Sequence, residues 1–212
     1  MFMASLADPA IGLPRSPARP KPVLHHVHPA ETEAIAAGFL SARTRTGPLV
    51  MLAYQQLERQ TDQQFAALTD PRGPYRITVA ATSEATPYRD AAELITSVLT
   101  SRILEVTRCP ADRAHPLLGG EPGGAYHRLR AVHDLIGHVA TGYGFDRDGE
   151  YSAWLAQRDR YTGLARWAAA TELHGEVSAL WITRQFAEHK AVLLDRHLLL
   201  DSALALPGSR IS

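Results

Sequence analysis

The chain has 212 residues, of which 45% are hydrophobic, and its 22 lysines and arginines balance 22 aspartates and glutamates. This length and composition predict a single domain with its own hydrophobic core. The balanced charge argues against a nucleic-acid partner or an anionic membrane surface, and the single cysteine, Cys109, excludes an internal disulfide and a cysteine-based zinc knuckle.

Residues 1–29 are rich in proline, which removes backbone donors, so we expect an extended arm or a disordered tail there. No apolar run approaches the roughly 20 residues that span a bilayer, and the first residues lack the order of a signal peptide. We therefore expect a cytoplasmic protein without membrane contact. A single helical domain is predicted over residues 30–200, followed by a loose tail over residues 201–212.

The spacing of apolar residues predicts a mainly α protein with a small β-element, an α+β fold. A helical pattern begins at Pro29 and is broken at Gly47-Pro48. Between the later elements, residues 108–124 form a long loop rich in proline and glycine, which indicates a functional segment. Further helices are predicted over residues 49–68, 87–100, 125–142, 149–161, 163–181 and 183–200, and short strands over 75–79 and 103–106.

The most informative motif is a pair of histidines, His133 and His138, on the helix predicted over residues 125–142. Their i, i+5 spacing places them about 140° apart on an ideal α-helix. The zinc-protease pair differs, because its i, i+4 spacing puts both ligands on one face. A metal shared by His133 and His138 therefore requires a helix that ends or distorts near Gly137, or a metal that sits off the end of the helix.

A third ligand is expected to be an acid on a neighbouring element, and Glu150, Glu172 and Glu176 are the candidates. Glu172 lies in an otherwise apolar run, where a carboxylate must be paired or bind a metal. Glu150 follows a glycine at an apparent helix start, where the helix dipole alone explains an acid. We therefore predict Glu172 as the third ligand. His174 is a less favoured fourth ligand and, with Glu176, is expected beside the site rather than on the metal.

Two histidines and one carboxylate leave coordination positions open, as non-heme iron(II) enzymes require for substrate and dioxygen. A structural zinc site is instead closed by four protein ligands. The predicted set of His133, His138 and Glu172 thus favours iron(II) over structural zinc.

These residues resemble a motif of the pterin-dependent aromatic amino acid hydroxylases. Residues 133–138, His-Asp-Leu-Ile-Gly-His, are similar to that family's His-Glu-Leu-Leu-Gly-His, which carries two iron-binding histidines. Trp167 and residues 170–175 resemble the Thr-Val-Glu-Phe-Gly context of its glutamate ligand, and residues 185–188 resemble its Ser-Phe-Gly-Glu segment. The likeness covers roughly residues 100–195 through short motifs.

The resemblance implies an iron site at His133, His138 and Glu172 on a reduced hydroxylase-like helical core. It places Asp134 where an acid lines the pterin pocket, and Arg108 is the candidate for binding a substrate carboxylate. A tetrahydropterin, a keto acid or the substrate itself stays open as electron donor. The chain is also similar to a family of bacterial and phage-associated proteins sharing an Arg-Ala-Val-His-Asp-x-x-Gly-His core, which implies one integrated domain and supplies no activity.

The sequence thus predicts an iron(II)-dependent oxygenase acting on dioxygen and a small organic, aromatic or amino-acid-derived substrate. One alternative is an HD-type metal-dependent phosphohydrolase, in which His115 and Asp195 would complete the set begun by His133 and Asp134. The motif has one residue too many for that family between Asp134 and Gly137. A second alternative is a helical interaction module whose histidines bind no metal.

Overall fold

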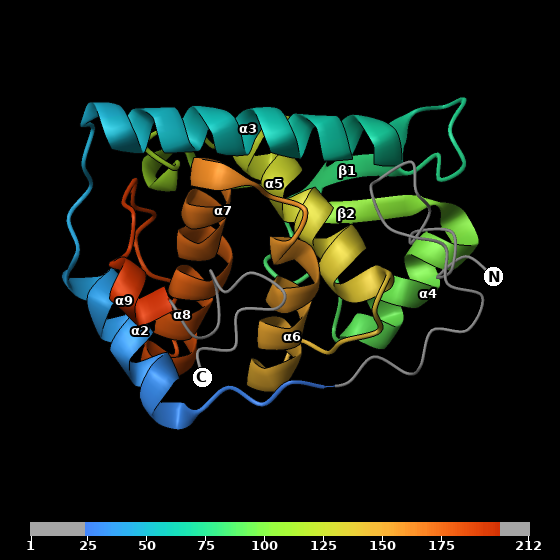
Figure 1. Ribbon diagram of the computed structural model, residues 1–212. Helices are drawn as coiled ribbons and strands as arrows, with labels where there is room; N and C mark the ends of the chain where they lie inside the picture. Colours follow the sequence, from blue (N-terminus) through green and yellow to red (C-terminus); the bar gives the residue numbers. More distant parts are fainter. Residues whose placement is uncertain (1–23, 200–212) are drawn as a thin grey trace.

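The computed structural model describes residues 24–199, and it is mostly helical with one small parallel sheet (Figure 1). The predicted fold class is therefore confirmed. Residues 1–23 of the predicted arm and the predicted tail lie outside the described residues. The elements are α2 (Pro29–Ser41), α3 (Pro48–Thr69), β1 (Thr78–Thr82), α4 (Ala91–Ser101), β2 (Ile103–Thr107), the 3-10 turn η2 (Ala111–Arg113), α5 (Ala125–His133), the π-helical η3 (Asp134–Val139), α6 (Arg147–Arg158), α7 (Gly163–Ala170), the π-helical η4 (Thr171–Gly175), α8 (Glu176–Thr183) and α9 (Arg196–Leu199).

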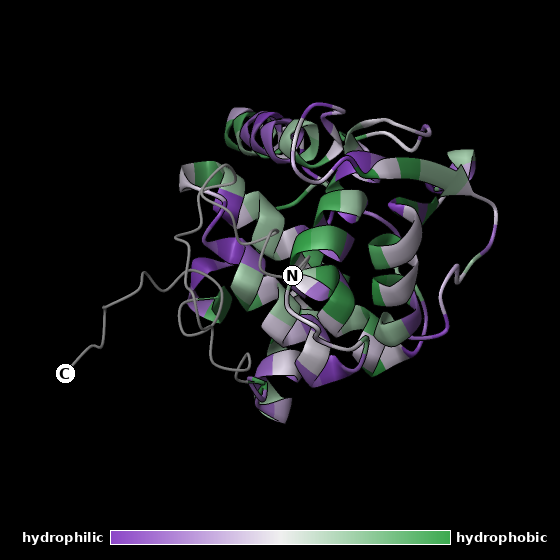
Figure 2. Cartoon of the chain, turned by 90° about the vertical axis from the view of Figure 1, so that its right-hand side faces the viewer, coloured by the Kyte–Doolittle hydropathy of each residue, from purple (hydrophilic) through white to green (hydrophobic). Residues whose placement is uncertain are grey.

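The long helix α3 lies across α5 and α7, and α2 packs against α8 at the other side of the molecule (Figure 1). The main core forms between these helices around Trp154, which is fully buried together with Tyr54 and Leu57 of α3. Strongly hydrophobic residues gather in the helices at the centre of Figure 2, while hydrophilic residues lie mainly toward the periphery. Apolar burial of this extent is the main term that stabilises the fold.

The small sheet is a β1–α4–β2 unit in which Thr78 to Thr82 pair in parallel with Ile103 to Thr107. Its inner side joins η3 in a second core cluster that includes Leu104, Val106, Leu135 and Ile136. The first strand begins at Thr78 rather than at the predicted residue 75. Arg76 has a φ of 54°, which interrupts the extended backbone between the buried Tyr75 and Ile77.

The helix predicted over residues 183–200 is wrong for most of its length. Helix α8 ends at Thr183, because the next residue, Arg184, has a left-handed φ of 59°, and helix returns only in the short α9. The backbone between them bonds to other elements instead: Arg45 donates to the carbonyl of Ala191, and the indole of Trp167 donates to the carbonyl of Leu194. Tertiary hydrogen bonds have overridden the helical pattern of this segment.

Residues 24–28 have no regular secondary structure, and they lie against α6. The backbone of His25 donates to Ser152, and His26 pairs with Asp148 at 2.6 Å. His28 caps α2, since its Nδ1 accepts from the amide of Ala30. Across the described residues, no helix combines the length and the apolar character needed to cross a membrane.

Candidate metal centre

His133 and His138 come together because the helix changes its hydrogen-bond pattern between them. His133 ends α5, and η3 follows with bonds of the i→i+5 type, such as the amide of Ala140 to the carbonyl of Leu135 at 2.9 Å. This pattern brings residues five apart onto one side of the helix. The two imidazole rings lie 4.9 Å apart at an interplanar angle of 87°. A distortion of the kind that a shared metal would require is therefore present around Gly137.

Each histidine holds its Nδ1 in a hydrogen bond on the far side of the ring. The Nδ1 of His138 lies 3.1 Å from the carbonyl oxygen of Tyr143, which can only accept, so this nitrogen carries the proton. The Nδ1 of His133 lies 2.8 Å from Oε1 of Gln157. Because the amide nitrogen of Gln157 donates to Tyr161, its Oε1 is the acceptor for His133. Both Nδ1 atoms are therefore donors, and neutral rings would present bare Nε2 atoms.

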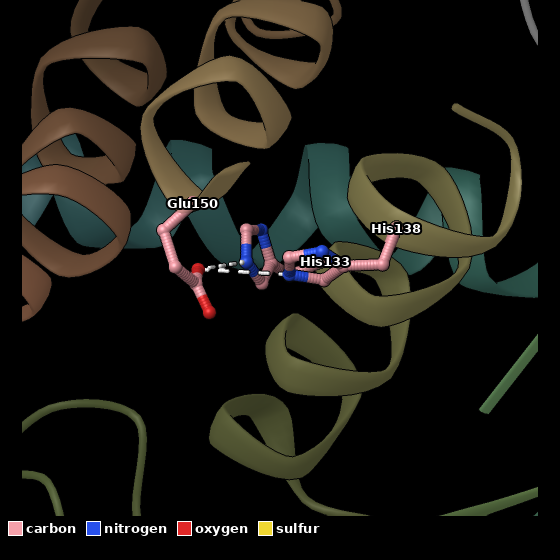
Figure 3. Close-up of side chains that lie close together, drawn as sticks. All are labelled: His133, His138 and Glu150. Atoms are coloured by element: carbon pink, nitrogen blue, oxygen red, sulfur yellow. Dashed lines mark hydrogen bonds and ion pairs between the residues drawn. The ribbon is translucent and has the colours of Figure 1, made fainter. Parts of the chain in front are cut away.

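Both Nε2 atoms face the same oxygen, Oε2 of Glu150, at 3.3 Å from His133 and 3.6 Å from His138 (Figure 3). The three residues can each offer a ligand atom within 4.8 Å of the others. Both histidines are almost completely buried, with 2% and 1% of their surface exposed. Two imidazole nitrogens aimed at one carboxylate oxygen need a shared cation, either protons or a metal ion.

The electrostatics of the group are strongly coupled. Burial alone would raise the pKa of Glu150. The nearby charges and hydrogen bonds of His138 and His133 outweigh burial and hold this pKa well below its usual range. Burial lowers the pKa of His138, and the charge and hydrogen bond of Glu150 outweigh this, so its pKa is raised. Glu150 is thus an anion at every physiological pH, as a metal ligand must be.

Helix α6 brings Glu150 and Gln157 to the histidines on one face. The side chain of Asp146 caps α6 by accepting from the amide of Gly149, so Glu150 lies in the helix proper. Its inward face continues through the buried Ala153 and Trp154 to Gln157. This i, i+3, i+4, i+7 series is the buried stripe of an amphipathic helix, and its two polar members are the ones that meet His133 and His138.

Two glycines allow the close approach of α6 to its neighbours. A Cβ on Gly137 would lie 3.0 Å from the Cβ of Ala153 and 3.3 Å from the ring of His133. A Cβ on Gly149 would lie within 3 Å of the backbone of Gly144, in the loop that presents the carbonyl of Tyr143 to His138. Small residues are therefore required where η3 and this loop touch α6.

The support of His133 extends to helix α3. The Tyr161 hydroxyl accepts a hydrogen bond of 3.2 Å from the side-chain amide of Gln157, and it lies 3.2 Å from the hydroxyl of Thr61. Gln157, Tyr161 and Thr61 are all buried. This connected polar network fixes the orientation of the His133 ring, in the way that outer groups orient metal ligands.

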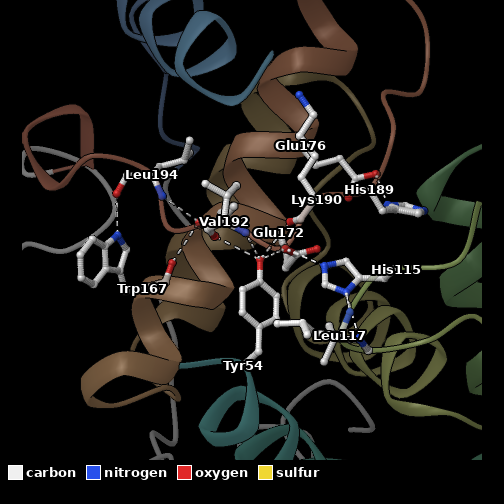
Figure 4. Close-up of polar contacts among 12 residues, drawn as sticks. Tyr54, His115, Leu117, Trp167, Glu172, Glu176, His189, Lys190, Val192 and Leu194 are labelled. Carbon is white, nitrogen blue, oxygen red and sulfur yellow. Dashed lines mark hydrogen bonds and ion pairs between the residues drawn. The ribbon is translucent and has the colours of Figure 1, made fainter. Parts of the chain in front are cut away.

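Glu172, the predicted third ligand, lies in a different polar cluster, and Glu150 stands in the place assigned to it. Glu172 is buried, as predicted, and its Oε1 accepts a short hydrogen bond from the hydroxyl of Tyr54 on α3 (Figure 4). The same oxygen lies 3.3 Å from Nε2 of His115. Its desolvated carboxylate is thus paired within the protein rather than with His133 and His138.

The surroundings of His115 define its tautomer. Its Nδ1 accepts from the amides of Leu117 and Leu118 at 3.1 and 2.9 Å, so a neutral ring carries its proton on the Nε2 that faces Glu172. The ring stacks on Tyr54 and on Tyr126. The long loop predicted to be functional therefore anchors Glu172 through His115.

The other predicted residues lie outside the three-residue group. Arg108 is exposed at the end of β2, and its guanidinium lies 3.5 Å from the carbonyl of Ala81. Asp134 is half-buried at the start of η3 and helps to raise the pKa of His138. Glu176 pairs with His189 at 3.0 Å. His174 is buried, and its ring contacts that of Tyr151.

The residues required by the phosphohydrolase alternative do not assemble with His133 and Asp134. His115 pairs with Glu172, and Asp195 is exposed at the start of α9, where it accepts from the amide of His197.

The sequence pattern did not identify Gln157, and it favoured Glu172 over Glu150 as the third ligand. The helix of Glu150 begins at Arg147, two residues earlier than predicted, with Asp146 as its cap. The signal that could have identified both is their position: Glu150 and Gln157 occupy the apolar stripe of α6. Polar residues on such a stripe require partners in the interior.

Comparisons of the chain with family models, with curated proteins and with solved structures returned no match.

Proposed function

We propose that this protein is a non-heme iron(II)-dependent oxygenase whose metal is held by His133, His138 and Glu150. The observation that supports the proposal is the convergence of two Nε2 atoms on one carboxylate oxygen, with each Nδ1 held in a hydrogen bond behind it. Outer hydrogen bonds of this kind are the usual companions of metal-binding histidines.

The donor set fits iron(II). Two imidazoles and one carboxylate are the ligands of the non-heme iron oxygenases, and with three protein ligands an octahedral ion keeps positions for other molecules. Bound iron would supply dioxygen binding and activation beside the substrate. Structural zinc sites commonly use several cysteine ligands. This chain has one cysteine, Cys109, and it lies outside the three-residue group.

The residues of the chain have defined tasks in this proposal. Gln157 and the carbonyl of Tyr143 hold the two rings in the tautomer that presents Nε2. Glu150 contributes the negative charge that offsets part of the charge of the ion. The buried position of both histidines keeps bulk water away from two of the three ligands.

Arg130 and Asp134 supply further charge near the histidines. Arg130 is half-buried three residues before His133, and therefore lies on the same side of α5. Burial lowers the pKa of Arg130, but Tyr126, Asp134, Glu176 and Glu150 raise it, so the guanidinium stays charged. This favours a small polar organic substrate, and the resemblance to aromatic hydroxylases extends the proposal to aromatic or amino-acid-derived compounds.

The test is iron analysis of protein produced without a histidine tag and loaded with Fe(II) under anaerobic conditions. We expect bound iron in the parent chain, loss of iron in His133→Ala, and oxygen consumption by the iron-loaded parent with a panel of small aromatic compounds and amino acids. The variant His26→Ala, which removes an exposed histidine outside the site, should retain the iron. Equal iron in His133→Ala and the parent would contradict the proposed site, and iron binding without oxygen consumption across the panel would contradict the oxygenase.

A further inference from the structure

A small cavity lies directly behind the proposed iron site. It is bounded by α2, α6, η4 and α8, and the residues around it include Thr32, Glu150 and His174, with Val27 and Val177. The residues 24–28 that lie against α6 contribute Val27 as part of its wall. The free space corresponds to about one water molecule.

Two buried polar groups of this wall lack hydrogen-bond partners among the described residues. Thr32 is 2% exposed and His174 is 4% exposed, and neither the Thr32 hydroxyl nor Nε2 of His174 has a hydrogen-bond partner. Glu150, whose side chain is 18% exposed, borders the same cavity and directs Oε2 toward the two histidines. Each buried polar group left unpaired costs on the order of 1–3 kcal/mol.

A single buried water molecule would provide hydrogen-bond partners for these groups. A buried water molecule typically makes about three hydrogen bonds to groups that would otherwise be unsatisfied. Among the groups that line the cavity, the Thr32 hydroxyl, Nε2 of His174 and a carboxylate oxygen of Glu150 can together donate to and accept from a single water. Burial lowers the pKa of His174 to about 4, so its ring is neutral near pH 7 and can take either role.

We propose that Thr32 and His174 hold a water molecule that hydrogen-bonds Oε1 of Glu150 and so positions this carboxylate for metal binding. Thr32 and His174 are positioning residues in this account, since they act on the metal only through the water and Glu150. The inference rests on the proposed function, because it assigns Glu150 to the metal. It explains why η4 carries a buried histidine that contacts none of the proposed ligands.

The first arm of the test does not involve metal. A high-resolution crystal structure of the metal-free parent should show a water within hydrogen-bond distance of the Thr32 hydroxyl, of His174 Nε2 and of Glu150 Oε1. The structure of Thr32→Val, in which a methyl group replaces the hydroxyl, should lack this water or show it weakly occupied. A dry cavity in the parent, or a water that contacts none of the three groups, overturns the proposal.

The second arm measures Co(II) affinity through the visible spectrum of the bound ion, with the metal alone as probe. We expect Thr32→Val and His174→Phe to weaken Co(II) binding by about tenfold, the lower end of the range for outer-shell groups. Thr32→Ser and His174→Gln keep hydrogen-bonding groups and should restore affinity to within about threefold. Val177→Ala alters the same wall without removing a polar group and should leave the affinity unchanged.

The outcomes separate the two proposals. If the parent binds no Co(II), the proposed function fails while the crystallographic arm still decides the water site. If the parent binds Co(II) and Thr32→Val and His174→Phe bind it equally well, the positioning role is refuted and the metal site stands. Equal losses in Val177→Ala and Thr32→Val would assign the effect to packing and would also refute that role.

Discussion

The imidazole rings of His133 and His138 lie 4.9 Å apart, edge to face, although an ideal α-helix would place these residues on different sides. The π-helical segment η3 accounts for this arrangement, and such segments occur frequently at functional sites. A second π-helical segment, η4, carries Glu172 and His174. The two most unusual stretches of the sequence thus coincide with the two π-helical segments of the described residues.

Gln157 provides the first prediction. Replacing it with leucine removes the acceptor of the His133 Nδ1 proton, so the ring loses its fixed orientation. Metal affinity should fall by about 10- to 100-fold in Gln157→Leu, while Gln157→Glu, which keeps an acceptor, should retain most of it. Titration with Co(II) measures both. Gln60→Leu is the control because the side chain of Gln60 bonds to Thr162 at the surface, away from His133, and equal losses at residues 60 and 157 would contradict the assigned role.

Gly137 provides the second prediction. An alanine Cβ there would lie 3.0 Å from Ala153 and 3.3 Å from the His133 ring, so η3 and α6 must move apart. Gly137→Ala should lower the free energy of unfolding by about 1–3 kcal/mol and weaken metal binding. Gly47→Ala is the matched control, since a Cβ at Gly47 meets nothing within 4 Å. Urea denaturation measures the stability, and Co(II) titration measures the metal affinity. If Gly137→Ala behaved like Gly47→Ala and the parent in both measurements, the prediction would be contradicted.

Tyr54 tests the separation of the two acidic clusters. Tyr54→Phe removes the donor that pairs with the buried Glu172 carboxylate, which should cost about 1–3 kcal/mol of stability. Because Glu172 lies outside the proposed metal site, Co(II) affinity should be unchanged. Tyr88→Phe, at a partly exposed tyrosine that accepts from the amide of Glu105, is the control for stability. Loss of metal from the Tyr54→Phe variant would indicate that Glu172 belongs to the metal site after all.

Because His174 is buried, we expect the free energy of unfolding to fall in acid. Burial lowers the pKa of His174 to about 4, whereas a histidine in an unfolded chain has a value near 6.5. Above about pH 6.5 the ring is neutral in both states. As the pH falls from about 6.5 to 4, the unfolded chain takes up a proton that the folded chain excludes, and stability falls by about 3 kcal/mol.

The measurement compares urea unfolding of the metal-free parent and of His174→Phe between pH 7.5 and pH 4. The parent should lose more stability over this interval than the variant, because titratable groups common to both contribute equally. Identical pH dependence in the two proteins would show that His174 is already protonated, or that it is solvated, in the folded state.

The sequence pattern was sufficient for those features that depend on local spacing. The fold class, the long helix predicted over residues 49–68 and the second strand follow from local rules, and the structure agrees with them. The burial of Glu172 also follows from its apolar neighbours.

The choice of partner could not be predicted in the same way. The buried carboxylate of Glu172 needed a partner, but its donor, Tyr54, lies 118 residues earlier in the chain. Glu150 does lie in the first turn of α6, as expected, but the helix dipole is not its only partner, because its side chain faces His133 and His138. Local pattern gives the face of a helix on which a residue lies, and only the packing of helices decides which residue it meets there.

The assignment of Glu150 as third ligand is tested most directly by metal affinity in Glu150→Gln and Glu172→Gln, measured beside the parent by Co(II) titration and iron analysis. Both substitutions preserve side-chain size and remove one negative charge. The structure predicts that Glu150→Gln weakens metal binding by at least about tenfold, and that Glu172→Gln binds metal as the parent does. The opposite pattern, metal lost from Glu172→Gln and retained by Glu150→Gln, would contradict the metal centre described for His133, His138 and Glu150.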